Sequence, residues 1–152
     1  MYLTGKVYLS DYTEDEKTVE AREALKDLKI LNGFKAKQIE VEVMYWRKAN
    51  AIHQWFVNNI QEGEDNCQTY YVTHSDLHDL LKIIDTILKT ENKEKQGELI
   101  DELLPPQSGF FFGSNEIDEW YFEDLKATQN TLTNFLNIEE NKRFELYYHS
   151  SW

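Results

Sequence analysis

The chain has 152 residues, which is the length of one ordinary domain, and 41% of them are hydrophobic, which excludes a wholly disordered protein. A net charge of −12 at pH 7 excludes general binding to nucleic acids and anionic membranes, since both need cationic side chains to approach phosphates. Two kinds of partner remain: a basic protein surface, or a small anion in a locally basic pocket.

The signals of secretion and membrane insertion are missing from the sequence. The single cysteine, Cys67, cannot form an internal disulfide, and no leading apolar segment resembles a signal peptide. No run of about 18 apolar residues is present to cross a bilayer. We therefore expect a cytoplasmic protein without a membrane span. Because no repeat or linker divides the sequence, we expect one globular domain over residues 1–152.

The chain begins with a predicted strand and a predicted helix. Residues 1–9 alternate in polarity and are rich in residues that favour strands. Residues 13–31 have helical spacing, and Thr13 and Glu16 have the spacing of a capping box. Asn32-Gly33 supplies a left-handed stop for this helix.

A second strand and helix follow, and they contain the most unusual segment of the chain. Residues 38–46 alternate strictly, and residues 47–60 then predict a helix that a polar loop over 61–66 ends. Strict alternation places Ile39, Val41, Val43 and Tyr45 on one face of the strand, and Glu40, Glu42, Met44 and Trp46 on the other.

The rest of the chain predicts three helices and two strands. In order, they are a strand over 68–72, a helix capped by Ser75 with its apolar stripe reaching residue 88, a short helix over 98–104, a long helix capped by Ser114 or Asn115, and a strand over 144–149. The long helix carries the stripe Ile117, Tyr121, Leu125, Thr128, Leu132 and Phe135. Together the elements predict an α+β fold, with a small, mostly antiparallel sheet packed by about four helices.

Local charge singles out the junction between the second strand and its helix. Residues 33–60 hold four basic and two acidic residues, a net charge of +2, so the rest of the chain sums to −14. A strand-to-helix junction exposes backbone N–H groups, and arginine grips phosphate and stacks on aromatic planes. The sequence therefore predicts a nucleotide pocket built from Trp46, Arg47, Lys48, His53 and Trp55. The alternative is that Arg47 and Lys48 pair with nearby acids while the tryptophans cover an edge of the core.

His53 has a second interpretation that competes with a ligand role. It shares one helix face with Ala49, Ile52, Phe56 and Ile60, and this face is apolar. That position favours a buried, neutral histidine held by a backbone or carboxylate partner over a histidine that touches a ligand.

Acidic residues suggest a different mode of binding. An acidic surface can imitate DNA phosphates and occupy the basic groove of a nucleic-acid-binding protein. The residues predicted to form such a surface are Glu62, Glu64, Asp65, Glu116, Asp118 and Glu119.

Metal and catalytic signatures are weak in this sequence. His74 and His78 are four residues apart, but no paired Cys or His-Glu-x-x-His pattern supports them, so we expect no metal and no cofactor. The glycine-rich segment over 109–114 lacks the Gly-Lys-Ser/Thr ending of a phosphate loop. No local sequence specifies a nucleophile with its base, so we expect no catalytic residues.

The terminal Trp152, which follows a strand, is expected to be docked.

Long segments spread over nearly the whole chain have distinctive sequences. They are the opening Met1-Tyr2-Leu3, the YWRKANxIHxWF pattern over 45–56, Asp65-Asn66-Cys67, Leu104-Pro105, SGFFFGS over 108–114, DEWY over 118–121, and YYxSSW over 147–152. Together they resemble a family of small proteins encoded by bacteriophages and prophages. The resemblance implies a setting, the cytoplasm of the infected host bacterium, rather than a chemistry.

In that setting we expect counter-defence, in which the protein binds and neutralises a component of bacterial antiviral immunity. The pocket would sequester a nucleotide-derived signal, or the acidic surface would block a host defence protein as a DNA mimic. The alternative from another class is an enzyme that acts on a nucleotide or nucleic acid. We expect no direct contact with nucleic acid or membrane, and the sequence leaves a homo-oligomer open.

Overall fold

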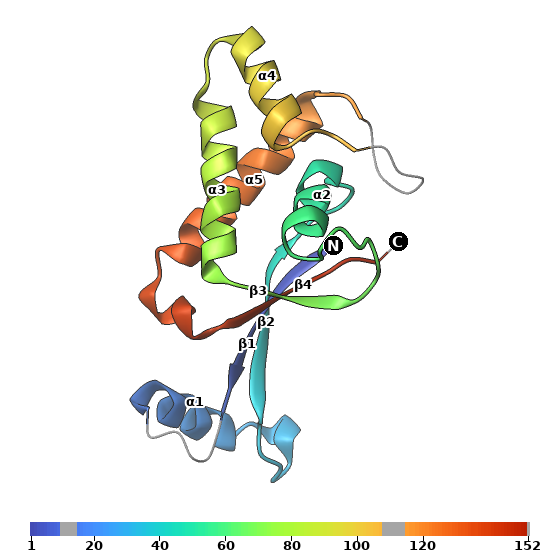
Figure 1. Ribbon diagram of the computed structural model, residues 1–152. Coiled ribbons are helices and arrows are strands. Elements are labelled where there is room, and N and C mark those ends of the chain that lie inside the picture. Colours follow the sequence, from blue (N-terminus) through green and yellow to red (C-terminus); the bar gives the residue numbers. More distant parts are fainter. Residues whose placement is uncertain (10–14, 108–114, 152) are drawn as a thin grey trace.

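The computed structural model describes residues 1–9, 15–107 and 115–151, and it confirms the predicted α+β fold (Figure 1). Its four strands form one antiparallel sheet in the order β2-β1-β4-β3. The strands are β1 (Tyr2–Tyr8), β2 (Gln38–Tyr45), β3 (Thr69–Val72) and β4 (Glu145–His149). The first and last strands of the chain therefore lie side by side at the centre of the sheet.

The helices cover one side of this sheet and one of its ends. They are α1 (Glu16–Lys26), α2 (Asn50–Asn59), α3 (His74–Lys89), α4 (Lys93–Leu103) and α5 (Glu119–Leu136), with 3-10 turns η1 (Lys29–Leu31) and η2 (Glu139–Arg143). Figure 1 shows α2, α3 and α5 on the same side of the sheet, with α1 at the far end of β1 and β2. Ion pairs Lys17–Glu140 and Arg143–Asp15 hold α1 against η2.

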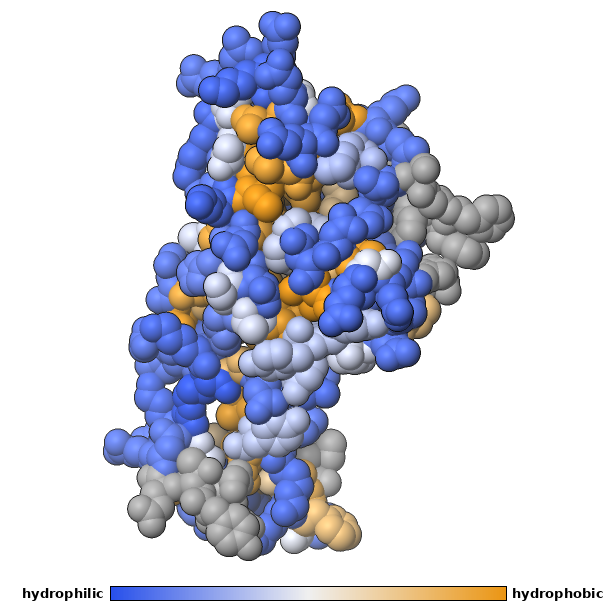
Figure 2. Space-filling model, in the orientation of Figure 1, coloured by the Kyte–Doolittle hydropathy of each residue, from blue (hydrophilic) through white to orange (hydrophobic). Residues whose placement is uncertain are grey.

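The packed core lies between the sheet and these helices. Leu3, Leu146 and Tyr148 project from the strands into the helical side, and all three are fully buried. The ring of Tyr148 stacks on Phe56 of α2, with 3.9 Å between the ring centroids and 5° between the planes. On the face drawn in Figure 2, hydrophilic residues dominate, and hydrophobic residues reach the surface mainly between α3 and α4.

Several helices begin at caps other than those predicted. The side chain of Asp15 caps α1, and that of Thr73 caps α3 in a capping box with Asp76. Asp118 caps α5, so the predictions of Ser75 and Asn115 as caps are wrong. The short helix α4 begins at residue 93, five residues before the predicted start, because Asn92 caps it. Thr13 and Ser114 lie outside the described residues.

A β-bulge interrupts the pairing of β2 with β1. Leu3 pairs with Met44, whereas the next residue of β1, Thr4, pairs with Glu42. Val43 is therefore an extra residue in β2. Since side chains alternate along a strand, one extra residue exchanges the two faces for everything that follows it.

The bulge decides where the aromatic residues at the end of β2 point. Tyr45 is 47% exposed and its ring lies 5.0 Å from that of Tyr2. Trp46 is turned inward and is only 2% exposed. The prediction that Trp46 shares the polar face of Glu40 and Glu42 is therefore wrong, because it assumed unbroken alternation.

Candidate functional site

The two tryptophans of the predicted pocket belong to the core. The indole Nε1–H of Trp46 donates to Thr128 Oγ1 of α5 at 2.8 Å, so its polar atom is satisfied inside the protein. Trp55 is 6% exposed and packs edge-on against Phe56. A ligand stacked on either ring would have to displace core packing. We therefore correct the prediction that Trp46 and Trp55 build a nucleotide pocket: both are core residues, although Trp46 also borders a hollow beside Arg47 and Lys48.

His53 is also part of the interior, at 2% exposure. Its Nε2 lies 3.0 Å from Asp65 Oδ1 and its Nδ1 lies 2.6 Å from the Tyr148 hydroxyl. Because a carboxylate only accepts, Nε2 carries the proton, and Nδ1 accepts from the hydroxyl. Burial lowers the pKa of His53 although Asp65 opposes the shift, so the ring is held neutral. This is the structural role predicted as the alternative to ligand binding.

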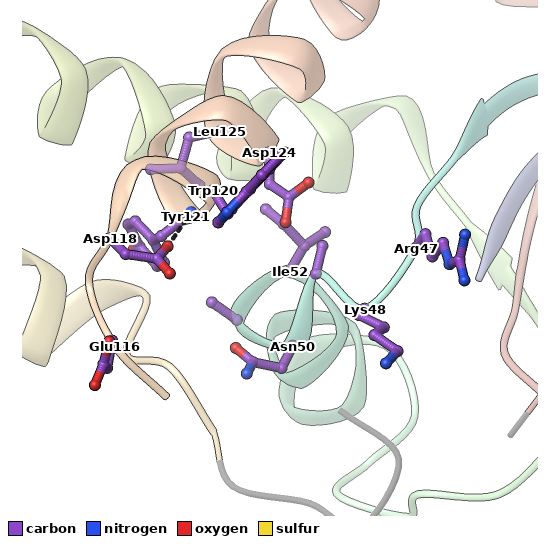
Figure 3. Close-up of a pocket in the computed structure, with 12 residues that line it drawn as sticks. Arg47, Lys48, Asn50, Ile52, Glu116, Asp118, Trp120, Tyr121, Asp124 and Leu125 are labelled. Carbon is purple, nitrogen blue, oxygen red and sulfur yellow. Dashed lines mark hydrogen bonds between the residues drawn. The ribbon is translucent and has the colours of Figure 1, made fainter. Parts of the chain in front are cut away.

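A cavity of about 270 Å³ lies between the start of α2 and the start of α5 (Figure 3). The chain segment before α2 contributes Arg47 and Lys48, and α2 itself contributes Ala51 and Ile52. The other side is formed by residues of α5 and of the segment before it, which are Glu116, Asp118, Trp120, Tyr121, Asp124 and Leu125. The cavity thus joins a basic side to an acidic and aromatic side.

The basic side has the features of an anion site. Arg47 and Lys48 are exposed and form no ion pair with any of the described residues, although the protein is strongly acidic. The part of the prediction in which these cations pair with nearby acids is therefore wrong. Lys48 has a left-handed backbone, with φ of 64°, a conformation that costs a residue with a side chain roughly 1–2 kcal/mol.

The first turn of α2 adds backbone donors to this side. Its N-cap, Ala49, has no side chain that can accept a hydrogen bond. The N–H groups of Ala51 and Ile52 find no acceptor among the described residues, and both residues line the cavity. Unpaired N–H groups and the helix dipole favour an anion at this end.

The opposite side presents an exposed tryptophan beside carboxylates. Trp120 is 73% exposed, and Asp124 lies one turn further along the same face of α5. Burial, together with the charges of Glu123 and Asp118, raises the pKa of Asp124 to about 6. No hydrogen-bond donor among the described residues reaches its carboxylate. A half-buried carboxylate without a donor is a candidate for contact with a ligand.

A second hollow extends the cavity along α5. It has a volume of about 590 Å³ and shares Arg47, Lys48, Trp120 and Asp124 with the first cavity. These four side chains thus stand between two adjoining spaces. A ligand that binds at them has room to extend beyond the first cavity.

The predicted acidic surface is divided between the two ends of α2. Glu116 and Asp118 line the cavity at the start of the helix, with Glu119 next to them in α5. Glu62, Glu64 and Asp65 follow its C-terminal end, about 15 Å away along a ten-residue helix. Asp65 is further committed to His53. The six acids do not form the single continuous patch that the sequence suggested.

Sequence reasoning missed Trp120 and Asp124. Both residues lie off the apolar stripe of α5. At such a position the large aromatic side chain of Trp120 does not reach the core. This position could have identified Trp120 from the sequence, since an aromatic residue off the stripe of an amphipathic helix is exposed unless a partner covers it.

The remaining candidates give no support for a metal centre. His74 begins α3 and its Nε2 lies 3.0 Å from the carbonyl oxygen of Asn141. Among the described residues, no group of three histidine, cysteine or acidic side chains is arranged to hold a metal ion. Cys67 is exposed. The glycine-rich segment over 109–114 and Trp152, which was predicted to be docked, lie outside the described residues.

None of the described helices combines the length and the apolar character needed to cross a membrane.

No family model, curated protein or solved structure matches this chain. The geometry of the cavity is therefore the basis for a functional proposal.

Proposed function

We propose that this protein acts by binding, as a phage counter-defence protein that sequesters a nucleotide-type ligand in the cavity between α2 and α5. The setting, the cytoplasm of an infected bacterium, rests on the resemblance of its segments to phage proteins. The ligand class rests on one observation: Arg47 and Lys48, without acidic partners among the described residues, line the same cavity as an exposed Trp120.

The phosphate and the base of a nucleotide each have a counterpart in this lining. A phosphate would lie at Arg47, Lys48 and the first turn of α2, where side-chain charge and backbone N–H groups act together. A base would stack on Trp120, a contact worth roughly 1–3 kcal/mol per base in other proteins. At about 270 Å³, the first cavity is just below the range of about 300–1,000 Å³ for small-molecule sites. The adjoining hollow provides the remaining room.

The DNA-mimic mechanism has less support from the geometry. A mimic needs a row of acids spaced along one surface, whereas Glu62 and Glu64 lie at the opposite end of α2 from Glu116 and Asp118. An enzyme acting on a nucleotide is the alternative from another class. Among the described residues that line the cavity there is neither a histidine nor a cysteine. Sequestration therefore remains the proposal, and unchanged ligand after prolonged incubation would separate it from catalysis.

Thermal unfolding with a panel of nucleotides tests the ligand class. At a concentration about 100 times the Kd, a ligand adds about 2.7 kcal/mol to the free energy of unfolding, which raises Tm by several degrees in a protein of this size. We expect such a shift with at least one nucleotide and its loss in Arg47→Ala. Lys126→Ala, which removes the same charge from an exposed position of α5, should keep it. No shift across the panel would reject nucleotide binding.

Purification from infected bacteria tests the counter-defence setting. The wild-type protein should carry a nucleotide-type compound that mass spectrometry identifies after denaturation, and Arg47→Ala should carry little of it. A phage that encodes Arg47→Ala should then be restricted by the defence system whose signal is bound. Equal phage growth with both variants on all hosts would contradict this setting while leaving the binding result intact.

A further inference from the structure

The acidic side of the cavity offers a ligand mainly hydrogen-bond acceptors. The three ionisable side chains that line it from the α5 side are Glu116, Asp118 and Asp124. An ionised carboxylate accepts hydrogen bonds and donates none. The hydroxyl of Tyr121 already donates to the carbonyl oxygen of Leu104 at 2.8 Å. A ligand group that contacts these carboxylates must therefore bring its own donors.

Asp118 and Asp124 are the acids best placed to receive those donors. One oxygen of Asp118 accepts from the backbone N–H of Tyr121 at 3.0 Å, which fixes the carboxylate at the start of α5 and leaves its other oxygen available (Figure 3). Asp124 has no donor among the described residues, and it shares a helix face with Trp120. A base stacked on Trp120 would bring its edge toward these carboxylates.

The four nucleobases differ in what that edge presents. The pairing edges of adenine and cytosine each combine an amino donor with a ring-nitrogen acceptor, which a carboxylate would repel. Uracil places one N–H between two carbonyl acceptors. Guanine alone presents adjacent donors, N1–H and the 2-amino group, which a carboxylate accepts as a pair, much as it accepts the paired donors of an arginine.

We propose that the cavity selects a guanine base, with Asp124 as the main acceptor of N1–H and the 2-amino group, Asp118 beside it, and Trp120 as the stacking surface. This inference rests on the proposed nucleotide binding and specifies its base. Arg47 and Lys48 belong to the segment before α2, and in Figure 3 their side chains extend away from Trp120 and Asp124, so the groups proposed for the phosphate are separate from those proposed for the base.

Calorimetric titration with three monophosphates tests base selection. Guanosine 5′-monophosphate should bind tighter than inosine 5′-monophosphate, which lacks the 2-amino group, by about tenfold or more, since hydrogen bonds to charged groups are strong. Adenosine 5′-monophosphate should bind more weakly still. Asp124→Asn should remove most of the preference for guanosine over inosine. Glu98→Gln, the same loss of charge at an exposed residue of α4, should keep it.

The outcomes separate this inference from the broader proposal. Equal affinity for all three nucleotides, lost in Arg47→Ala, would overturn guanine selection and leave nucleotide binding in place. An unchanged preference in Asp124→Asn would overturn the role of Asp124. If none of the three binds while another nucleotide does, guanine selection is again rejected. If no nucleotide binds, the proposed function itself fails.

Discussion

Asp124 is a carboxylate in an environment that opposes its charge. It is half-buried on α5, near the charges of Glu123 and Asp118, and no donor among the described residues compensates it. Carboxylates with a raised pKa cluster at functional sites, which makes Asp124 a candidate for contact with a ligand. The same residue therefore links the stability of the free protein to the ligand binding that we propose for the cavity.

Asp124→Asn should raise the stability of the free protein at pH 7. The pKa of Asp124 is about 6 in the folded state against the ordinary 3.8, so the folded state binds more protons between these values. Stability is consequently lost as pH rises through this window, and the neutral asparagine avoids that loss. Urea denaturation should show the variant more stable at pH 7 and equal to wild type near pH 3.5. Glu98→Gln, on the exposed face of α4, should change little at either pH.

Tyr148→Phe should destabilise the protein by about 1–3 kcal/mol, because Nδ1 of His53 would remain buried without its donor. Tyr147→Phe is the matched control. Its hydroxyl bonds to the exposed Glu145, so its effect should stay within about 0.5 kcal/mol. Equal effects of the two variants, measured by urea denaturation, would contradict a structural role for the hydrogen bonds of His53.

The sequence indicated which residues lie near the site, but it predicted only in part which of their side chains face the core and which face the cavity. The local excess of positive charge identified Arg47 and Lys48, and both line the cavity. Helical spacing correctly indicated that His53 faces the core. Trp46 was misplaced because a bulge depends on pairing with β1, which no periodicity within residues 38–46 reveals.

At the scale of elements, the centre of the sheet depends on a close approach between β1 and the start of β4. Gly5 in β1 is buried, and a Cβ built on it would lie 2.9 Å from Cδ1 of Phe144. That distance is shorter than real side chains tolerate, so the ring and the strand can be this close only because Gly5 has no side chain.

Gly5→Ala should therefore cost about 1–3 kcal/mol of stability through overpacking. Adding Phe144→Leu should recover part of this loss, since a smaller side chain relieves the contact. Gly97→Ala in α4, where nothing lies within 4 Å of the added Cβ, should instead stabilise by roughly 0.5–1 kcal/mol. Thermal or urea unfolding of the single variants and of the double variant should rank their stabilities in this order: Gly5→Ala lowest, Gly5→Ala with Phe144→Leu next, and Gly97→Ala highest. Similar values for Gly5→Ala and Gly97→Ala would rule out the steric explanation.

The existence and type of the elements were predictable, while several of their ends were not. Apolar spacing identified α3 and α5, and alternation identified β1 and β2. The caps were missed where several Ser, Thr, Asn or Asp residues compete, as before α5. There, Asp118 was preferred over Asn115 by contacts that local sequence does not encode.

At the scale of the whole molecule, the protein carries 28 acidic against 16 basic residues. Added salt should therefore have opposite effects on its stability and on its binding of an anion. Added NaCl screens the repulsion among the acids and should raise Tm, despite weakening exposed pairs such as Lys17–Glu140. The same salt should weaken the proposed nucleotide binding, because Arg47 and Lys48 are exposed and their charges are screened. Melting and binding curves from about 0.02 to 0.5 M NaCl, spanning Debye lengths of roughly 20 to 4 Å, check both signs.

The site itself could not be assembled from the sequence. Arg47 and Trp120 lie far apart in the chain and line one cavity because α2 and α5 lie on the same side of the sheet. The order β2-β1-β4-β3, which brings the two ends of the chain together, is a long-range property. Local sequence patterns therefore identified the basic side of the cavity, whereas its α5 side depends on how the helices are arranged in the fold.

The most direct test follows the tryptophan indole N–H signals by NMR during a titration with guanosine 5′-monophosphate, with Trp120→Phe to assign the signal of Trp120. The exposed Trp120 signal should move in a saturable way, while that of Trp55, buried on α2, stays in place. In Arg47→Ala the movement should require a much higher nucleotide concentration. Saturable binding that leaves the Trp120 signal unchanged would show that the cavity between α2 and α5 is not the site.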